Sequence, residues 1–260
     1  MIVNKNLVSS LKVSGALAFM RDYSSSIDVS VIIPAYDEEE TIAEVLQDVK
    51  KVSGFLGNVE VIVVDDGSKD RTGEKVVAFP YVKYIRHKHN LGKGAAIQTG
   101  IKNSSGKIIV IQDADLEYLP KCIPSLVKPI SEGSMDIVYG SRFNSKPKGM
   151  SFAHFWGNTI LSLVTRFLYN IKIEDVMTGQ KVFRRSVLDF IKLKENGFVV
   201  EIEITCLAFN QSRKFTELPI PYSYRNHGHS KIKPFDGFKS LVKLFTLFFR
   251  SDASYMQKNA

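Results

Sequence analysis

Short runs of β-branched and aliphatic residues alternate with helical patterns from position 29 onward. The run VSVIIP (29–34) predicts a buried strand, and Asp37 is placed to cap a helix that continues through Leu46 and Val49. Further strands, separated by helices, are predicted at VEVIVVDDGS (59–68), VKYIRH (82–87), KIIVIQDAD (107–115) and MDIVYGSR (135–142). Because crossovers of this length join parallel strands, the pattern predicts an α/β fold with a doubly wound, mostly parallel sheet flanked by helices.

The rhythm of the pattern changes after residue 143. The segment KPKG (146–149) predicts a loop, and a long apolar helix, shorter mixed elements and a basic C-terminal helix follow it. We expect the apolar helix to run from Phe152 to Tyr169. The chain is thus predicted to hold an N-terminal arm (1–27), one α/β domain (28–234) and an amphipathic helix and tail (235–260). Within the domain, a nucleotide-binding half precedes an acceptor-side half.

Composition narrows this picture. A chain of 260 residues with 44% hydrophobic residues can bury one substantial core. The net charge of +8 indicates an anionic partner without distinguishing nucleic acid, lipid phosphate and nucleotide. Cys122 and Cys206 form no CxxC pair, which argues against a disulfide framework or a zinc site and fits a reducing, cytosolic compartment. No stretch reaches the roughly 20 apolar residues of a membrane span, so we expect a soluble or peripheral protein.

Acidic residues gather where the predicted strands end. The first strand ends in PAYDE (34–38), the second in DDGS (65–68) and the fourth in DAD (113–115). In an open parallel sheet, ligands bind outside the carboxyl ends of the strands. Three acidic clusters on one edge would repel one another without a cation or hydrogen-bond donors, so this edge is the predicted site.

Asp113 and Asp115 are the strongest candidates for a metal site. Carboxylates at alternate positions past an apolar strand point the same way. Such oxygen ligands suit Mg²⁺ or Mn²⁺, which share their coordination with substrate phosphates, and Glu117 could add a third oxygen. The alternative is that these residues only form a turn or cap a helix.

Other residues on this edge suit a nucleotide. Asp65 and Asp66 could accept hydrogen bonds from a base or ribose, or could form an Asx-type turn instead. Tyr36 could stack on a base or simply pack above the sheet. Lys93 lies in NLGKG (90–94) at the start of a helix, where free amides and an ammonium favour a diphosphate.

The number and order of these motifs resemble the family-2 glycosyltransferases of the GT-A fold. Within that family, the chain is most similar to the dolichyl-phosphate (polyprenyl-phosphate) mannose and glucose synthases. The resemblance extends from Val29 to Arg250. It rests on VIIPAYDEE (31–39), VVDDGS (63–68), NLGKGAA (90–96), QDADLEY (112–118), GSRF (140–143), DVMTGQKVFRR (175–185), EIEIT (201–205) and RNHGHSKIKPFDG (225–237).

The resemblance implies a role for each matching residue. The nucleotide would be held by Pro34, Ala35, Tyr36, Glu38, Asp65, Asp66, Lys93 and Asp113. The metal, Mg²⁺ or Mn²⁺, would be held by Asp113, Asp115 and Glu117. The acceptor phosphate would be held by Arg142, Ser230 and Lys231, and Asp115, Arg142 and Lys93 would carry the catalysis.

The implied reaction moves a hexose, with inversion, from a nucleotide-diphosphate sugar to a polyprenyl or dolichyl phosphate. Two positions depart from the family's pattern. Asp37 replaces the usual Asn, and the arginine that mannose synthases often carry early in the long helix is absent, since His154 and Trp156 stand there. The absence of that arginine favours a UDP-glucose-like donor, with GDP-mannose as the alternative.

Other functions remain open at this point. The same fold could transfer sugar to a sugar hydroxyl, which requires a carboxylate base. Candidates are Asp175, Glu201 and Glu203, which could instead pair with Arg184 or Arg185 or lie on a solvated helix face. Asp175 could equally order the turn at 178–179. A nucleotidyltransferase is disfavoured by the acidic first loop, and a nucleic-acid binder by the acidic ligand edge.

The C-terminal segment FDGFKSLVKLFTLFFR (235–250) places Phe238, Leu241, Val242, Phe245 and Phe249 at helical spacing among basic residues. Such a helix could lie in a membrane interface or pack on the body or another subunit. The basic run around it favours peripheral contact with the cytoplasmic face of a membrane. The alternative is a partner that is a membrane protein or a second copy of the chain.

Overall fold

The computed structural model describes residues 27–143, 152–222 and 234–258. Seven strands form one sheet in the order β3-β2-β1-β4-β6-β5-β7. The strands are β1 Val29–Ala35, β2 Val59–Asp65, β3 Val82–Arg86, β4 Ile108–Gln112, β5 Ile137–Ser141, β6 Gln180–Arg184 and β7 Phe215–Pro219. The helices are α2 Ile42–Ser53, α3 Thr72–Val77, α4 Lys93–Lys102, α5 Ile123–Ser131, α6 Phe152–Tyr169, α7 Arg185–Leu188, α8 Val200–Gln211 and α9 Pro234–Lys258, with a 3₁₀ turn η1 at Pro120–Cys122.

The first four strands form a parallel block. β1 lies between β2 and β4, and β3 pairs with the outer edge of β2. β6 runs antiparallel to both β4 and β5, and β7 is parallel to β5. The predicted α/β architecture with a mostly parallel sheet is therefore confirmed, and of these seven strands only β6 runs opposite to the others.

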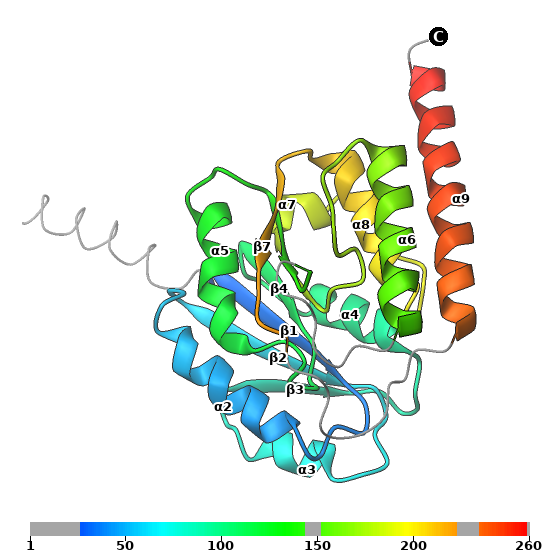
Figure 1. Ribbon diagram of the computed structural model, residues 1–260. Coiled ribbons are helices and arrows are strands. Elements are labelled where there is room, and N and C mark those ends of the chain that lie inside the picture. The colour runs from blue at the N-terminus through cyan, green and yellow to red at the C-terminus, as the bar shows by residue number, and fades with distance from the viewer. Residues whose placement is uncertain (1–26, 144–151, 223–233, 259–260) are drawn as a thin grey trace, which may run out of the picture.

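The sheet separates two hydrophobic cores. Val31 and Ile33 of β1 pack with Val45 of α2 in one core, whereas Ile32 between them packs with Ile97 of α4 in the other. Successive side chains of a strand point to opposite faces, so a strand covered on both sides must be apolar throughout. Figure 1 shows α2 and α5 on one face of the sheet and α4, α6 and α8 on the other, with α9 beside α6.

One predicted helix start is wrong. Asp37 does not cap α2, because the residue before that helix is Thr41 and α2 begins at Ile42. Asp37 instead has a φ of 49°, and its Oδ1 accepts a hydrogen bond from the Lys69 amide at 2.7 Å. Its carboxylate therefore ties the loop after β1 to the loop after β2.

Two strands, β6 and β7, were not predicted from the sequence pattern. β6 and β7 lie in the stretch that shows only mixed periodicity, between α6 and α9. The long apolar helix has the predicted bounds, and the C-terminal helix continues past the predicted residue 250 to Lys258. Within the described residues, none of the helices is long and apolar enough to cross a membrane.

Candidate active site

An ion-paired cluster lies at the carboxyl edge of the sheet. Lys93 is the first residue of α4, Asp113 follows β4 directly, and Glu201 comes from the first turn of α8. The Lys93 ammonium lies 2.7 Å from Oδ1 of Asp113 and 2.8 Å from Oε1 of Glu201. Burial alone would lower the pKa of Lys93, but the two carboxylates raise it above its ordinary value. Lys93 therefore stays positively charged. This agrees with the sequence prediction of an ammonium group at the start of the helix.

The pKa of Asp113 is raised by burial and by two neighbouring carboxylates. Burial, the neighbouring Asp115 and the nearby Glu201 raise it to about 6, although Lys93 acts in the opposite direction. A further cation at this point would relieve the repulsion between these carboxylates. The strand end is thus electrostatically suited to a divalent metal.

The turn after β4 arranges the remaining acidic residues. Leu116 adopts a φ of 61°, and Oδ1 of Asp115 accepts the Glu117 amide at 3.1 Å. The Tyr222 hydroxyl lies 3.4 Å from Oε2 of Glu117. A positive φ at a branched residue such as leucine is uncommon and is found most often at functional turns.

The donor set fits a magnesium or manganese ion that is completed by substrate. Asp113 and Asp115 offer hard carboxylate oxygens, and Glu117 lies on the same turn. Among the residues that the structure describes, no three Asp, Glu, His or Cys side chains already form a closed metal cluster. Mg²⁺ typically takes one or two carboxylates and fills its other positions with water and phosphate oxygens, which agrees with this open arrangement.

Gly179 permits the close packing of this strand end. A Cβ on Gly179 would overlap Oδ2 of Asp113 and lie 2.8 Å from the Tyr118 ring. The sequence indicates a turn at Thr178 and this glycine, but no contact of the glycine with Asp113. Because it precedes a strand that no periodicity revealed, its contact with Asp113 emerges only in the fold.

The two acidic residues after β2 are engaged with the protein. Asp65 is fully buried and accepts the Ser68 amide at 2.8 Å and the Tyr84 hydroxyl at 2.6 Å. Burial and Asp65 together raise the pKa of Tyr84 to about 12. This carboxylate-to-amide hydrogen bond closes the turn around Gly67, but it reaches three residues on rather than the two of an Asx turn.

Asp66 connects two loops of the predicted nucleotide pocket. Its Oδ2 accepts the Gly92 amide at 2.7 Å, its Oδ1 accepts the Leu91 amide at 3.0 Å, and His87 Nδ1 lies 2.7 Å from Oδ1. The NLGKG loop is therefore fixed to the end of β2. Gly92 has a φ of 103°, which favours glycine, and a Cβ there would also overlap the backbone of Asn196.

The end of β1 lies beside these loops. The Asp66 amide donates to the Ala35 carbonyl at 2.8 Å, and the Glu38 amide donates to Oγ1 of Thr72 at 2.8 Å. Pro34 and Ala35 are buried, whereas Tyr36 and Glu38 are partly exposed. The fold thus gathers the residues predicted for the nucleotide at one edge of the sheet.

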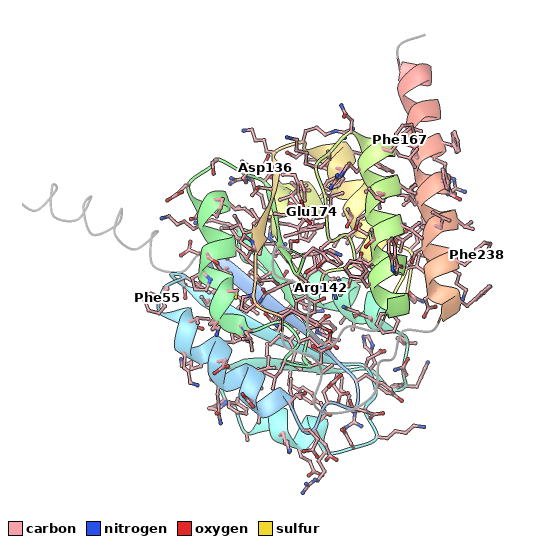
Figure 2. The ribbon with its side chains drawn as sticks, viewed as in Figure 1. Phe55, Asp136, Arg142, Phe167, Glu174 and Phe238 are labelled. Carbon is pink, nitrogen blue, oxygen red and sulfur yellow. The ribbon has the colours of Figure 1, made fainter. Side chains whose placement is uncertain are left out.

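Arg142 follows β5 and is surrounded by acidic and aromatic groups. Its Nε and Nη2 donate to the two carboxylate oxygens of Asp175, each at 2.6 Å. Its guanidinium carbon lies 5.5 to 5.8 Å from the ring centres of Tyr118, Phe143 and Tyr222. Burial acts to lower the pKa of Arg142, but Asp175 raises it, so the side chain stays charged. Figure 2 shows Arg142 between the sheet and α6.

Asp175 is itself held from three sides. Asn158 of α6 donates to Oδ1 of Asp175 at 2.6 Å, and the Asp175 amide donates to Glu217 of β7 at 2.9 Å. Arg142 is thereby tied to α6 and to the far edge of the sheet. Ser230 and Lys231, the other predicted acceptor contacts, lie outside the described residues.

The candidate bases do not form the ion pairs with Arg184 or Arg185 that the sequence offered as an alternative. Arg184 pairs with Asp136 at 2.7 Å, and Arg185 donates to a backbone carbonyl. Glu203 is buried rather than solvated, and it pairs with Lys243 of α9 at 2.8 Å. Helix α8 is covered by α9, so its acidic residues point into protein rather than into water.

The family model described as glycosyl transferase family 2 matches residues 30–191. The chain belongs to this family. The matched stretch contains Asp65, Lys93, Asp113 and Arg142, whereas Glu201 lies beyond it. The family-2 resemblance drawn from the motifs is thus confirmed.

Relatives within the family include transferases named for lipid phosphates. The dolichol-phosphate mannosyltransferase of Pyrococcus furiosus is 35% identical over 226 residues, which cover 84% of this chain and 63% of that protein. The dolichyl-phosphate hexose transferase of Haloferax volcanii is 30% identical over 222 residues, covering 84% of this chain and 93% of that protein. This chain thus spans less than two thirds of the Pyrococcus relative.

Solved structures confirm the predicted GT-A fold. Glucosyl-3-phosphoglycerate synthase from Mycobacterium tuberculosis, in complex with UDP, has a TM-score of 0.71 at 20% identity, and the match covers 85% of this chain and 80% of that one. The same synthase with Mn²⁺, UDP and glucosyl-3-phosphoglycerate has a TM-score of 0.69. At this identity, the likeness concerns the fold.

Proposed function

We propose that this family-2 protein is an inverting glycosyltransferase that moves a hexose from a nucleotide-diphosphate sugar to a polyprenyl phosphate. The observation that carries the proposal is the pairing of two sites along one sheet edge. The Asp113–Lys93 cluster suits a metal and a diphosphate, and Arg142 suits a second phosphate. Tyr118 lies between the two sites. Its ring contacts Arg142 on one side, and Gly179, which packs against Asp113, also packs against the Tyr118 ring.

The donor side would bind a divalent metal with the diphosphate. Asp113, Asp115 and Glu117 would hold Mg²⁺ or Mn²⁺, which acts as a Lewis acid on the departing nucleoside diphosphate. Lys93 would add a fixed positive charge beside those phosphates. Asp65 and Asp66 order the loops around the nucleoside, while Pro34, Ala35, Tyr36 and Glu38 line the end of β1.

The acceptor side favours an anion over a sugar hydroxyl. A lipid phosphate is already negatively charged near neutral pH and needs no general base, whereas a hydroxyl acceptor requires one. The candidate bases Asp175 and Glu201 are both buried in ion pairs, with Arg142 and with Lys93. Arg142 has five N–H donors, and two of them are directed at Asp175, so its others would serve the acceptor phosphate together with Ser230 and Lys231.

For the donor we favour a UDP-sugar over GDP-mannose. Trp156 and His154 stand where mannose synthases often carry an arginine. The structurally similar mycobacterial synthase was solved with UDP, while the Pyrococcus relative is named a mannosyltransferase. A direct comparison of donors separates the two.

A lipid acceptor agrees with two apolar stripes on the surface. On α6, Trp156, Ile160, Leu163 and Phe167 are exposed at spacings of three and four residues, and on α9 the same holds for Phe238, Val242, Phe245 and Phe249. The helices lie side by side, with the Tyr169 and Phe248 rings 5.8 Å apart. Phe167 and Phe238 mark the two stripes in Figure 2. We propose that both helices rest on the cytoplasmic face of a membrane.

The test crosses UDP-glucose, UDP-GlcNAc and GDP-mannose with a short polyprenyl phosphate in the presence of Mn²⁺ or Mg²⁺. The proposal expects metal-dependent transfer to the lipid with one preferred donor, and loss of that transfer in Asp115→Asn. The control is Asp48→Asn, a change at an exposed pair with Lys51 on α2. Transfer to a soluble sugar but to no lipid phosphate would assign the acceptor to the alternative class.

A further inference from the structure

Four side chains of alternating charge run from the sheet edge into the core. Asp113 pairs with Lys93, and Lys93 pairs with Glu201, as described above. Glu201 pairs in turn with Lys181 of β6. The Lys181 side chain has no exposed surface. The sequence pattern did not single out this lysine, which lies two residues past the glycine that contacts Asp113.

A fully buried lysine is costly for a fold. Its ammonium loses its hydration, and burial lowers its pKa even though Glu201 stabilises its charge. Replacing a buried ion pair with apolar side chains of similar size is often neutral or stabilising in other proteins. Stability alone is therefore a weak reason for Lys181, and its place beneath the donor site suggests another one.

Glu201 divides its two oxygens between the two lysines. Oε1 faces Lys93 and Oε2 faces Lys181, which also lies 3.4 Å from the Glu201 carbonyl oxygen. The Tyr139 ring, 5.1 Å from the Lys181 ammonium, closes its other side. Lys181 therefore restricts the rotation of the Glu201 carboxylate, and this rotation decides where Oε1 directs Lys93.

We propose that Lys181 is a positioning residue of the donor site: it fixes the carboxylate of Glu201, which holds the ammonium of Lys93 beside Asp113. The inference rests on the proposed function in taking Lys93 as the cation that meets the diphosphate. If Asp113 bound a metal, Glu201 would still hold Lys93. Lys93 would then stay directed at the phosphates, and no further conformational entropy would be lost in ordering it.

The first test compares Lys181→Met with Lys243→Met. The second variant breaks the ion pairs of Lys243 with Glu195 and with Glu203, another buried glutamate on the same helix α8, so it controls for loss of a buried charge pair. Affinities for UDP and for uridine are measured by calorimetry with Mn²⁺ present. Lys181→Met is expected to weaken UDP binding by roughly 10- to 100-fold, as loss of a supporting contact commonly does. Lys181→Arg should restore part of that loss.

Uridine separates positioning from a general disturbance of the fold. It lacks the phosphates that Lys93 would meet, so its affinity should be unchanged in Lys181→Met and in Lys243→Met. Equal losses for UDP and uridine, or no loss for either, would overturn the proposal. If Lys181→Met does not fold, Lys181→Gln keeps a hydrogen-bond donor toward Glu201 without the buried charge, and it is expected to show a smaller loss that is again selective for UDP.

Crystal structures of the ligand-free wild type and Lys181→Met keep the two proposals distinguishable. The expected result is that the Lys93 ammonium leaves Asp113 in the variant and stays there in the wild type. An unmoved Lys93 would overturn the positioning role. If the wild type binds no nucleotide at all, the proposed function fails, while the position of Lys93 still decides this inference.

Discussion

Each carboxylate that sequence reasoning offered as a general base has a cation against it. Asp175 meets Arg142, Glu201 meets Lys93, and Glu203 meets Lys243. These buried ion pairs occupy the carboxylate oxygens that a hydroxyl acceptor would have to approach. At the scale of single residues, the chemistry thus favours an acceptor that brings its own negative charge.

Arg142→Lys tests the acceptor contact. Lysine keeps the charge but loses the two parallel hydrogen bonds to Asp175 and the planar stacking on the rings. We expect transfer to the lipid phosphate to fall by roughly 10- to 100-fold while UDP affinity stays the same. Arg184→Lys, which alters the pair with Asp136, is the control. An equal fall in both variants would contradict a specific role for Arg142.

Glu217 predicts a pH dependence of stability. Burial, together with Asp175 and Glu174, raises the pKa of Glu217 to about 7, although two backbone amides favour the charged form. A raised carboxyl pKa contributes stability that is fully present below the ordinary value of about 4.5 and is lost as pH rises through 7. We expect the free energy of unfolding to fall by up to about 3 kcal/mol across this window.

The measurement is urea unfolding at several pH values from 4.5 to 8, in the wild type and in Glu217→Gln. The difference in unfolding free energy between the two proteins should change with pH in the predicted direction, because the glutamine cannot titrate. A difference that is constant over this range would show that Glu217 does not titrate near pH 7.

At the scale of elements, the approach of β6 to the end of β4 shapes the site. Gly179, just before β6, lies against Asp113, and Lys181 within β6 reaches Glu201. The side chain of Gln180 between them donates to Gln112 at 2.6 Å and is also buried. The antiparallel strand β6 and the residue just before it therefore support the donor site with three consecutive contributions of different kinds.

Gly179→Ala tests this close approach. The added methyl overlaps the Asp113 carboxylate, so we expect weaker UDP binding in the presence of Mn²⁺ and a stability loss of about 1–3 kcal/mol. Gly157→Ala is the matched control, because nothing lies within 4 Å of a Cβ placed at Gly157. Gly157 lies in helix α6, where alanine in place of glycine stabilises by roughly 0.5–1 kcal/mol. A Gly179→Ala protein that binds UDP normally would exclude this packing constraint.

The sequence predicted the elements whose pattern is repetitive. β1, β2 and α6 have strong apolar runs, and they lie where the pattern placed them. β6 and β7 were missed because QKVFR and FTELP are short and mix charged with apolar residues, and Lys181 within β6 is buried by an ion pair rather than by hydrophobicity. Ion-pair partners such as Arg142 and Asp175, 33 positions apart, depend on the tertiary fold.

At the scale of the whole molecule, the exposed apolar residues lie mostly on α6 and α9. The α6 stripe begins near the acceptor side, since the ring of Phe155 at the start of α6 lies 5.4 Å from that of Phe143, and Phe143 packs on Arg142. A lipid phosphate at Arg142 would thus have an aromatic path toward the surface that we propose for membrane contact.

The membrane assignment is tested by sedimentation with vesicles of phosphatidylcholine and an anionic phospholipid. The variant Ile160→Ser/Leu163→Ser/Phe167→Ser should bind at least about tenfold more weakly than the wild type, because three large apolar side chains no longer enter the interface. Phe55→Ser/Phe190→Ser is the control, since both rings are more than three quarters exposed but lie elsewhere on the molecule. Unchanged vesicle binding, or a wild-type dimer that the α6 variant dissociates, would contradict the assignment.

The central claim is the inverting transfer of a sugar to a lipid phosphate, and the configuration of the product tests it most directly. The lipid product formed from the preferred donor with Mn²⁺ would be isolated, and its anomeric centre examined by NMR. The proposed single displacement predicts a β-linked hexosyl phosphate, one nucleoside diphosphate released per lipid glycosylated, and no product with Asp115→Asn. An α-linked product, or donor turnover that never yields a glycosylated lipid, would contradict it.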